Sequence, residues 1–145
     1  MSVFGRIIRG LATADVPAGE GAVWMVGDGG YGIGAVGESN YQPALEALAG
    51  GRKPRGVRLN VMAELVPEDE NPHDAQAVAV DIEGRRVGYL SRKHARVFRE
   101  EVASARAEGM RVHCRGRIQG GWDRGRGDRG HFGVWLDIAS GDPST

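Results

Sequence analysis

The segment Val57–Leu90, VRLNVMAELVPEDENPHDAQAVAVDIEGRRVGYL, decides the fold class because it contains three strand patterns. From position 57 to 65, every second residue is apolar, which is the period of a strand with one buried face. Residues 78–82 repeat this period, and Glu83-Gly84 predicts a tight turn into a third strand that ends at Leu90. The side chains expected inside from the first strand are Val57, Leu59, Val61, Ala63 and Leu65.

Three further strands and two helices are expected outside this segment. The strands are predicted at 33–37, 110–120 and 131–138. A short helix is expected from Asn40, as its cap, to Gly50, and a longer helix from Ser91 to Gly109. Short antiparallel strands in a chain of this size favour closure into a small barrel. We therefore expect a mainly β fold: a six-stranded antiparallel barrel, OB-like or SH3-like, flanked by two α-helices.

Length and charge limit the class of protein. The 145 residues fit one domain, and 19 Lys and Arg balance 19 Asp and Glu, which argues against a generally basic nucleic-acid-coating protein. With one cysteine, Cys114, and no long apolar run, we expect a cytoplasmic protein with no membrane segment.

The expected organisation is a flexible N-terminal arm, one domain and a short disordered tail. The arm is 1–30, with a short strand at 22–26, the domain is 31–140 and the tail is 141–145. The glycine-rich run 27–34 has no following Lys-Ser/Thr, so a linker is favoured over a phosphate-binding loop.

The first candidate site is the acidic loop 68–74, EDENPHD. Its carboxylates could bind a divalent metal for a nuclease-like reaction. The alternative is a solvated turn in which Asn71-Pro72 sets the backbone and Asp74 accepts hydrogen bonds from neighbouring N–H groups.

The second candidate is a basic row on the outward face of strand 110–120, formed by Arg111, His113, Arg115 and Arg117. Together with the Arg-Gly loop 120–130 and the rings of Trp122 and Trp135, it has the components of a single-stranded nucleic-acid groove. A solvated strand face with ion pairs explains the same residues equally well.

The remaining polar residues give no case for an enzyme. His94 is expected on a helix surface, and neighbouring His113 and Cys114 point to opposite faces of a strand, so they do not form a metal pair. No nucleophile has a positioned base. We expect no catalytic residue, no bound metal and no cofactor.

Taken together, three motifs resemble the HIRAN domain family. They are VGESNYQPAL at 36–45, AELVPE with NPHDAQAVAV between 63 and 80, and VGYL at 87–90. The resemblance covers roughly 33–138 and is that of a stand-alone bacterial HIRAN protein. It implies a six-stranded antiparallel barrel with two helices, and binding of the 3′-hydroxyl end of single-stranded DNA.

The resemblance also assigns roles to individual residues. Asp74 matches the acidic residue that accepts a hydrogen bond from the terminal hydroxyl, and Tyr41 matches an aromatic that stacks on the terminal nucleotide. With the basic row, the expected nucleic-acid-binding residues are Asn40, Tyr41, Asn71, His73, Asp74, Tyr89, Arg115, Arg117 and Trp122.

The expected function is non-catalytic recognition of single-stranded DNA, through its 3′-hydroxyl end, in DNA repair or replication restart. Expected partners are single-stranded DNA or DNA ends, with repair or helicase proteins as further partners. The alternatives are a protein-interaction adaptor that binds a peptide in the barrel groove through Tyr41, Tyr89 and Trp122, and a metal-dependent nuclease that uses Glu68, Asp69 and Asp74.

Overall fold

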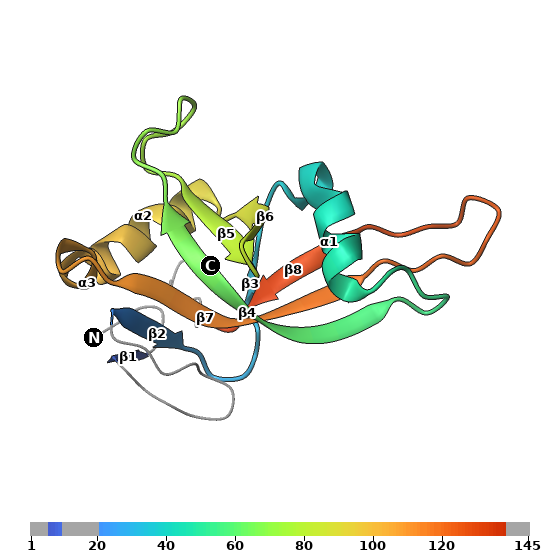
Figure 1. The fold of residues 1–145 in the computed structure, drawn as a ribbon, viewed down its shortest axis with the longest axis horizontal. Helices are drawn as coiled ribbons and strands as arrows, with labels where there is room; N and C mark the ends of the chain where they lie inside the picture. Colours follow the sequence, from blue (N-terminus) through green and yellow to red (C-terminus); the bar gives the residue numbers. More distant parts are fainter. Residues whose placement is uncertain (1–5, 10–20, 139–145) are drawn as a thin grey trace.

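The computed structural model describes residues 6–9 and 21–138, which form one sheet of eight strands with three α-helices and one 3-10 turn (Figure 1). In chain order the elements are β1 Arg6–Arg9, β2 Ala22–Val26, β3 Ile33–Gly34, η1 Glu38–Tyr41, α1 Gln42–Ala49, β4 Val57–Pro67, β5 Val78–Ile82, β6 Arg85–Tyr89, α2 Arg92–Glu101, α3 Ala103–Ala107, β7 Arg111–Gly120 and β8 Phe132–Leu136.

Six of these strands form an antiparallel half-barrel in the order β6, β5, β4, β7, β8, β3. Its two edges meet where Val36, just after β3, pairs with Tyr89 at the end of β6. Each N–H donates to the carbonyl of the other residue, at 2.8 and 2.9 Å. The predicted mainly β fold with a six-stranded barrel-like sheet is therefore confirmed.

The other two strands come from the predicted N-terminal arm. The strand expected at 22–26 is present as β2, which runs parallel to the first half of β7 and pairs antiparallel with β1. Residues 1–5 and 10–20 of that arm and the predicted tail 141–145 lie outside the described residues. No helix in the described part of the chain is long and apolar enough to cross a membrane.

The core lies on the concave face of the half-barrel and follows the predicted alternation in β7 and β8. The buried residues alternate with partly or fully exposed ones, and they are Val112, Cys114, Gly116 and Ile118 in β7 and Phe132, Val134 and Leu136 in β8. Helix α2 closes this core with Phe98, which is fully buried. The patterns of β7 and β8 thus correctly predicted which of their faces point inward.

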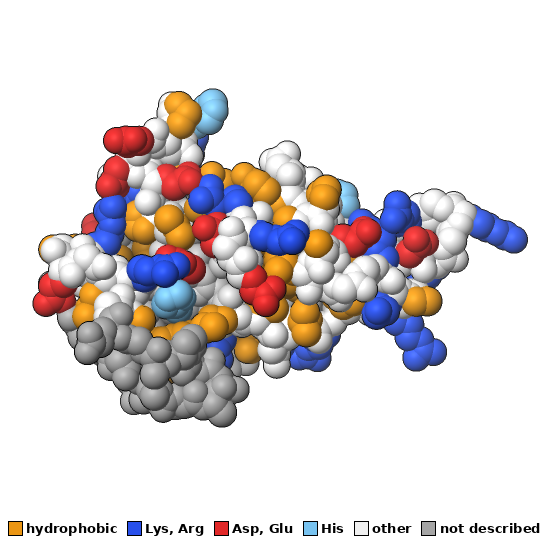
Figure 2. Space-filling view, viewed as in Figure 1, with side chains coloured by type: hydrophobic (Ala, Val, Ile, Leu, Met, Phe, Trp, Pro, Cys, Tyr) orange, Lys and Arg blue, Asp and Glu red, His pale blue; other side chains and the backbone are white. Residues whose placement is uncertain are grey.

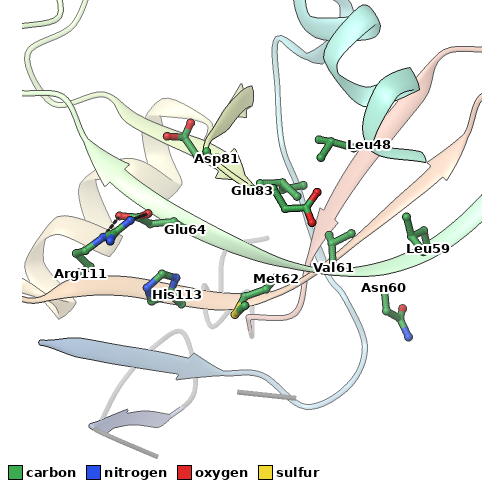
Figure 3. Close-up of a pocket in the computed structure, with 12 residues that line it drawn as sticks. Leu48, Leu59, Asn60, Val61, Met62, Glu64, Asp81, Glu83, Arg111 and His113 are labelled. Atoms are coloured by element: carbon green, nitrogen blue, oxygen red, sulfur yellow. Dashed lines mark hydrogen bonds and ion pairs between the residues drawn. The ribbon is translucent and has the colours of Figure 1, made fainter. Parts of the chain in front are cut away.

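The first half of β4 departs from its predicted alternation. Leu59 is 38% exposed, and Val57 and Val61 are only partly buried. Pairing with β5 begins at Ala63, so the preceding residues have β7 on one edge and no strand on the other. This uncovered half of β4 lines a pocket together with Leu48 of α1 (Figure 3).

The helices also differ from the prediction in two places. The expected helix 91–109 is broken at Val102, whose φ and ψ of −106° and 8° separate α2 from α3. Its predicted cap is confirmed, because the Ser91 hydroxyl accepts a hydrogen bond from the His94 N–H at 3.2 Å. Asn40 does not cap α1: it lies within η1, and Tyr41 precedes the helix without a side-chain cap.

The glycine-rich run 27–34 is tethered rather than a free linker. The buried carboxylate of Asp137 accepts hydrogen bonds from the N–H groups of Gly29, at 2.9 Å, and Tyr31, at 3.3 Å. Gly27 packs so closely on the Asp137 backbone that a side chain there would collide with it. The sequence did not reveal this tether because Asp137 lies 108 residues away from Gly29.

Candidate nucleic-acid interface

The β4–β5 loop is held in shape by its own polar side chains. The Asn71 side-chain oxygen accepts hydrogen bonds from the N–H groups of His73 and Asp74, at 2.8 and 3.1 Å. One Asp74 oxygen accepts from the Gln76 N–H at 2.9 Å. These are the side-chain turns expected of Asn and Asp, and they present an exposed His73 and a partly buried Asp74 on a defined backbone.

Glu68 is not the solvated turn residue that was predicted. One of its oxygens accepts hydrogen bonds from the Tyr89 hydroxyl and the Asn71 amide, both at 2.9 Å, and the other accepts from Arg86 at 2.6 Å. Partial burial alone would raise the pKa of this carboxyl, but the bonds from Asn71, Tyr89 and Arg86 outweigh burial and lower it. Glu68 is therefore charged and fixes the hydroxyl of Tyr89.

Asp69 likewise accepts hydrogen bonds, from two arginines of the helices α2 and α3. Arg106 and Arg99 each donate to one of its oxygens at 2.7 Å and hold the pKa of the carboxyl at about 2. Within residues 6–9 and 21–138, no group of three or more His, Cys, Asp or Glu side chains is arranged to hold a metal ion. The carboxylates predicted as alternative metal ligands instead bind arginines.

Tyr89 is the point where the three sequence motifs meet. Its backbone pairs with Val36 of the VGESNYQPAL motif, and its hydroxyl donates a hydrogen bond to Glu68 at the base of the β4–β5 loop. The loop and α1, which follows η1, rise from the same side of the sheet (Figure 1). We call the surface formed by η1, residues 68–76 and Tyr89 the rim.

Tyr41 and Asn40 occupy the η1 side of this rim. Asn40 is exposed and Tyr41 is partly buried, both at the end of the turn that the Val36–Tyr89 pair anchors. Among the described contacts, no hydrogen bond or ring contact joins Tyr41 to Asp74. The predicted residues of the three motifs therefore belong to one rim without touching each other directly.

Basic residues of α2 complete the rim and were missed from the sequence. The Arg92 side chain is 76% exposed, and its Nε lies 3.9 Å from the second oxygen of Asp74. Arg96 donates to the Gln76 side chain at 3.0 Å. The available signal was the segment SRKHARVFRE, whose Lys and Arg recur with helical spacing immediately after the VGYL motif.

Arg115 and Arg117 lie away from the rim. Both belong to the outward face of β7, where Arg117 donates to the Asn60 side chain at 3.1 Å and covers the Tyr31 ring at 3.9 Å. Asn60 points to the side of β4 opposite Leu48 of α1 (Figure 3). The structure therefore divides the predicted binding residues between two sides of the sheet.

The other members of the predicted basic row have local partners. Arg111 forms two hydrogen bonds with the Glu64 carboxylate, and His113 stacks on Trp24 with ring centroids 5.4 Å apart. Burial lowers the pKa of His113. Trp122 donates to Asp128 at 3.2 Å and packs its ring on Gly130, so it stabilises the β7–β8 loop.

The fold and the rim define a small mainly β binding domain with its three sequence motifs gathered at one edge of a half-barrel. The family model for the HIRAN domain matches residues 39–122, more than half of the chain, and the chain belongs to the HIRAN domain family. No curated protein and no solved structure matches it. HIRAN domains are generally modules that bind single-stranded DNA at its 3′ end, and they are usually non-catalytic on their own.

Proposed function

We propose that the rim recognises the 3′-hydroxyl end of single-stranded DNA, as a non-catalytic step in DNA repair or replication restart. The observation that carries this proposal is the arrangement around Asp74. One of its oxygens is used by the loop, while the other has Arg92 at 3.9 Å and remains available to accept a hydrogen bond.

The charge of Asp74 selects the ligand. A carboxylate repels a phosphate, and in the reduced dielectric of a partly buried site this repulsion is worth several kcal/mol, about 4 at 4 Å. A terminal hydroxyl instead donates a hydrogen bond to the carboxylate. The neighbouring Arg92 has the charge and exposure to hold the last phosphate, so the pair distinguishes a strand end from its interior.

The remaining rim residues suit the terminal nucleotide. Tyr41 supplies a ring for stacking, with Asn40 exposed beside it. Tyr89 contributes its ring rather than its hydroxyl, because the hydroxyl is bound to Glu68. Asn71 acts through the loop backbone that presents His73 and Asp74.

The test compares two labelled oligonucleotides that differ only in a 3′-hydroxyl or a 3′-phosphate. We expect fluorescence anisotropy to show tighter binding of the 3′-hydroxyl strand. Asp74→Ala should bind both strands equally while keeping the wild-type circular dichroism spectrum. Glu70→Gln, which removes an exposed carboxylate from the same loop, should keep the preference. Equal binding of both strands by the wild-type protein would refute end recognition.

The protein-adaptor alternative retains one supporting observation, the uncovered half of β4. Leu59 and Met62 are 38% and 37% exposed beside a strand edge that could accept an extended peptide. Two of its predicted anchors are engaged, since Trp122 packs in its loop and the Tyr89 hydroxyl binds Glu68. Binding that weakens steeply with added salt favours DNA over such a peptide.

A further inference from the structure

Positive charges exceed negative charges at one end of the molecule. The turn 52–58 and the loop 121–131 together contain seven Lys and Arg and two Asp, whereas the whole chain carries 19 of each sign. Figure 2 shows Lys and Arg side chains gathered around the β7–β8 loop. We call these two segments the basic end.

Backbone hydrogen bonds join the two segments into one surface. The Lys53 N–H donates to the Gly121 carbonyl at 3.3 Å, and the Asp123 N–H donates back to the Lys53 carbonyl at 3.0 Å. The Arg52 side chain donates to the Gly130 carbonyl at 2.6 Å. Cations from distant parts of the sequence are thus held together by fixed contacts rather than by chance proximity of loops.

Some cations of this surface have internal partners. Arg52 pairs with Glu46 at 3.0 Å, Arg129 with Asp123 at 3.3 Å, and Arg124 with Asp128 at 3.7 Å. The other four are exposed and form no ion pair within the described part of the chain: Lys53, Arg55, Arg58 and Arg126. Several like charges near one another raise the energy of the isolated domain, and a polyanion would relieve it.

The basic end continues onto the outward face of the half-barrel. In the β4–β7 register, Arg58 lies opposite Gln119 and Asn60 opposite Arg117, so Arg58 and Arg117 are diagonal neighbours on one face. Arg117 carries the Tyr31 ring at 3.9 Å and faces Trp135, which is 41% exposed, on β8. Guanidinium groups beside aromatic rings suit phosphates and unpaired bases.

We propose that the basic end and the adjoining Arg117 face form a second DNA contact, which holds the phosphates of single-stranded DNA independently of how the strand ends. This inference rests on the proposed DNA-binding function. The two carboxylates of this surface, Asp123 and Asp128, are paired with Arg129 and Arg124, so the surface contributes affinity but no preference for a 3′-hydroxyl.

The test measures binding of a long single-stranded oligonucleotide at several salt concentrations. The variant Lys53→Gln/Arg55→Gln/Arg126→Gln removes three exposed cations that have no described ion pair. Each lost phosphate contact should reduce the slope of log K against log salt by about 0.7, so three should reduce it by about 2. The ratio of affinities for 3′-hydroxyl and 3′-phosphate strands should stay at the wild-type value.

Two further variants test whether the effect belongs to the basic end. Arg85→Gln removes an exposed cation at the start of β6, outside both segments of the basic end, and should leave the salt slope unchanged. Arg126→Gly should weaken binding without harming the fold, because position 126 has a φ of 57° that glycine adopts freely.

The proposed second contact and the rim give separable results. A triple variant with the wild-type salt slope and affinity would overturn the second contact, even if the 3′-hydroxyl preference is observed. If Asp74→Ala loses that preference while its salt slope stays at the wild-type value, the rim and the basic end bind DNA independently.

Discussion

At the scale of single residues, Asp69 shows how the β4–β5 loop is fixed to the helices. Hydrogen bonds from Arg106 and Arg99 lower its pKa from 3.8 to about 2. A carboxyl whose pKa is lower in the folded than in the unfolded state stabilises the fold fully above the unfolded value. That contribution is lost as the pH falls from about 4 towards 2.

The variant Asp69→Asn should therefore be less stable than the wild type at neutral pH. The difference should shrink as the pH falls from 4 to 2, because the wild type loses its two charged hydrogen bonds in that range. Urea unfolding of both proteins at a series of pH values measures this difference in the free energy of unfolding. Glu70→Gln, in the neighbouring exposed position, should follow the wild-type profile, and a constant difference between Asp69→Asn and wild type would contradict the assignment.

Single residues also show where sequence reasoning stops. The turn chemistry of Asn71 and Asp74 was predicted because the partner N–H groups lie two or three residues away. The partners of Glu68 and Asp69 were missed because they are distant in the sequence: Arg86 lies 18 residues away from Glu68, and Arg106 lies 37 residues away from Asp69. Only the fold brings these pairs together.

At the scale of elements, the connection between β2 and β3 depends on one buried carboxylate that follows β8. Asp137 is 3% exposed and accepts hydrogen bonds from the Gly29 and Tyr31 N–H groups. It therefore holds in place the segment whose Tyr31 ring lies under Arg117.

Replacing Asp137 with alanine should cost about 1.5–3 kcal/mol, the range for hydrogen bonds to charged groups. Thermal or urea unfolding measures this loss, and weaker DNA binding should accompany it if Tyr31 contributes to the second contact. Asp28→Ala removes an exposed carboxylate that accepts a hydrogen bond from the Gly30 N–H in the same connection, and it should change stability by less than about 0.5 kcal/mol. Equal effects of the two substitutions would show that Asp137 has no special role.

The burial pattern of a strand was predictable where pairing partners run along its whole length. Strands β7 and β8 have pairing partners along their length, and their alternation matched burial residue by residue. The alternation in β4 failed at Leu59 because β5 ends before it reaches that half of the strand. Helix 91–109 was predicted as one unit because its apolar spacing continues across the break at Val102.

At the scale of the whole molecule, the half-barrel closes through a single pair of residues. Val36 and Tyr89 form the only bridge in the described residues between the segment after β3 and strand β6. The same pair positions η1 beside the β4–β5 loop. Closure of the sheet and assembly of the rim are therefore one structural event.

Gly88 is the position at which this closure can be tested. A Cβ there would lie 3.0 Å from the Val36 carbonyl oxygen and 3.3 Å from the Ala35 side chain, so Gly88→Val should push β6 away from the closing segment. We expect a loss of about 1–3 kcal/mol from overpacking. The amide protons of Val36 and Tyr89 should lose their protection from hydrogen exchange, and 3′-hydroxyl preference should fall with them. The control is Gly32→Val, at an exposed position with no atom within 4 Å of its Cβ, which should leave the amide protection and the 3′-hydroxyl preference intact. If the amide protons of Val36 and Tyr89 stay protected in Gly88→Val, the bridge does not depend on the close approach at Gly88.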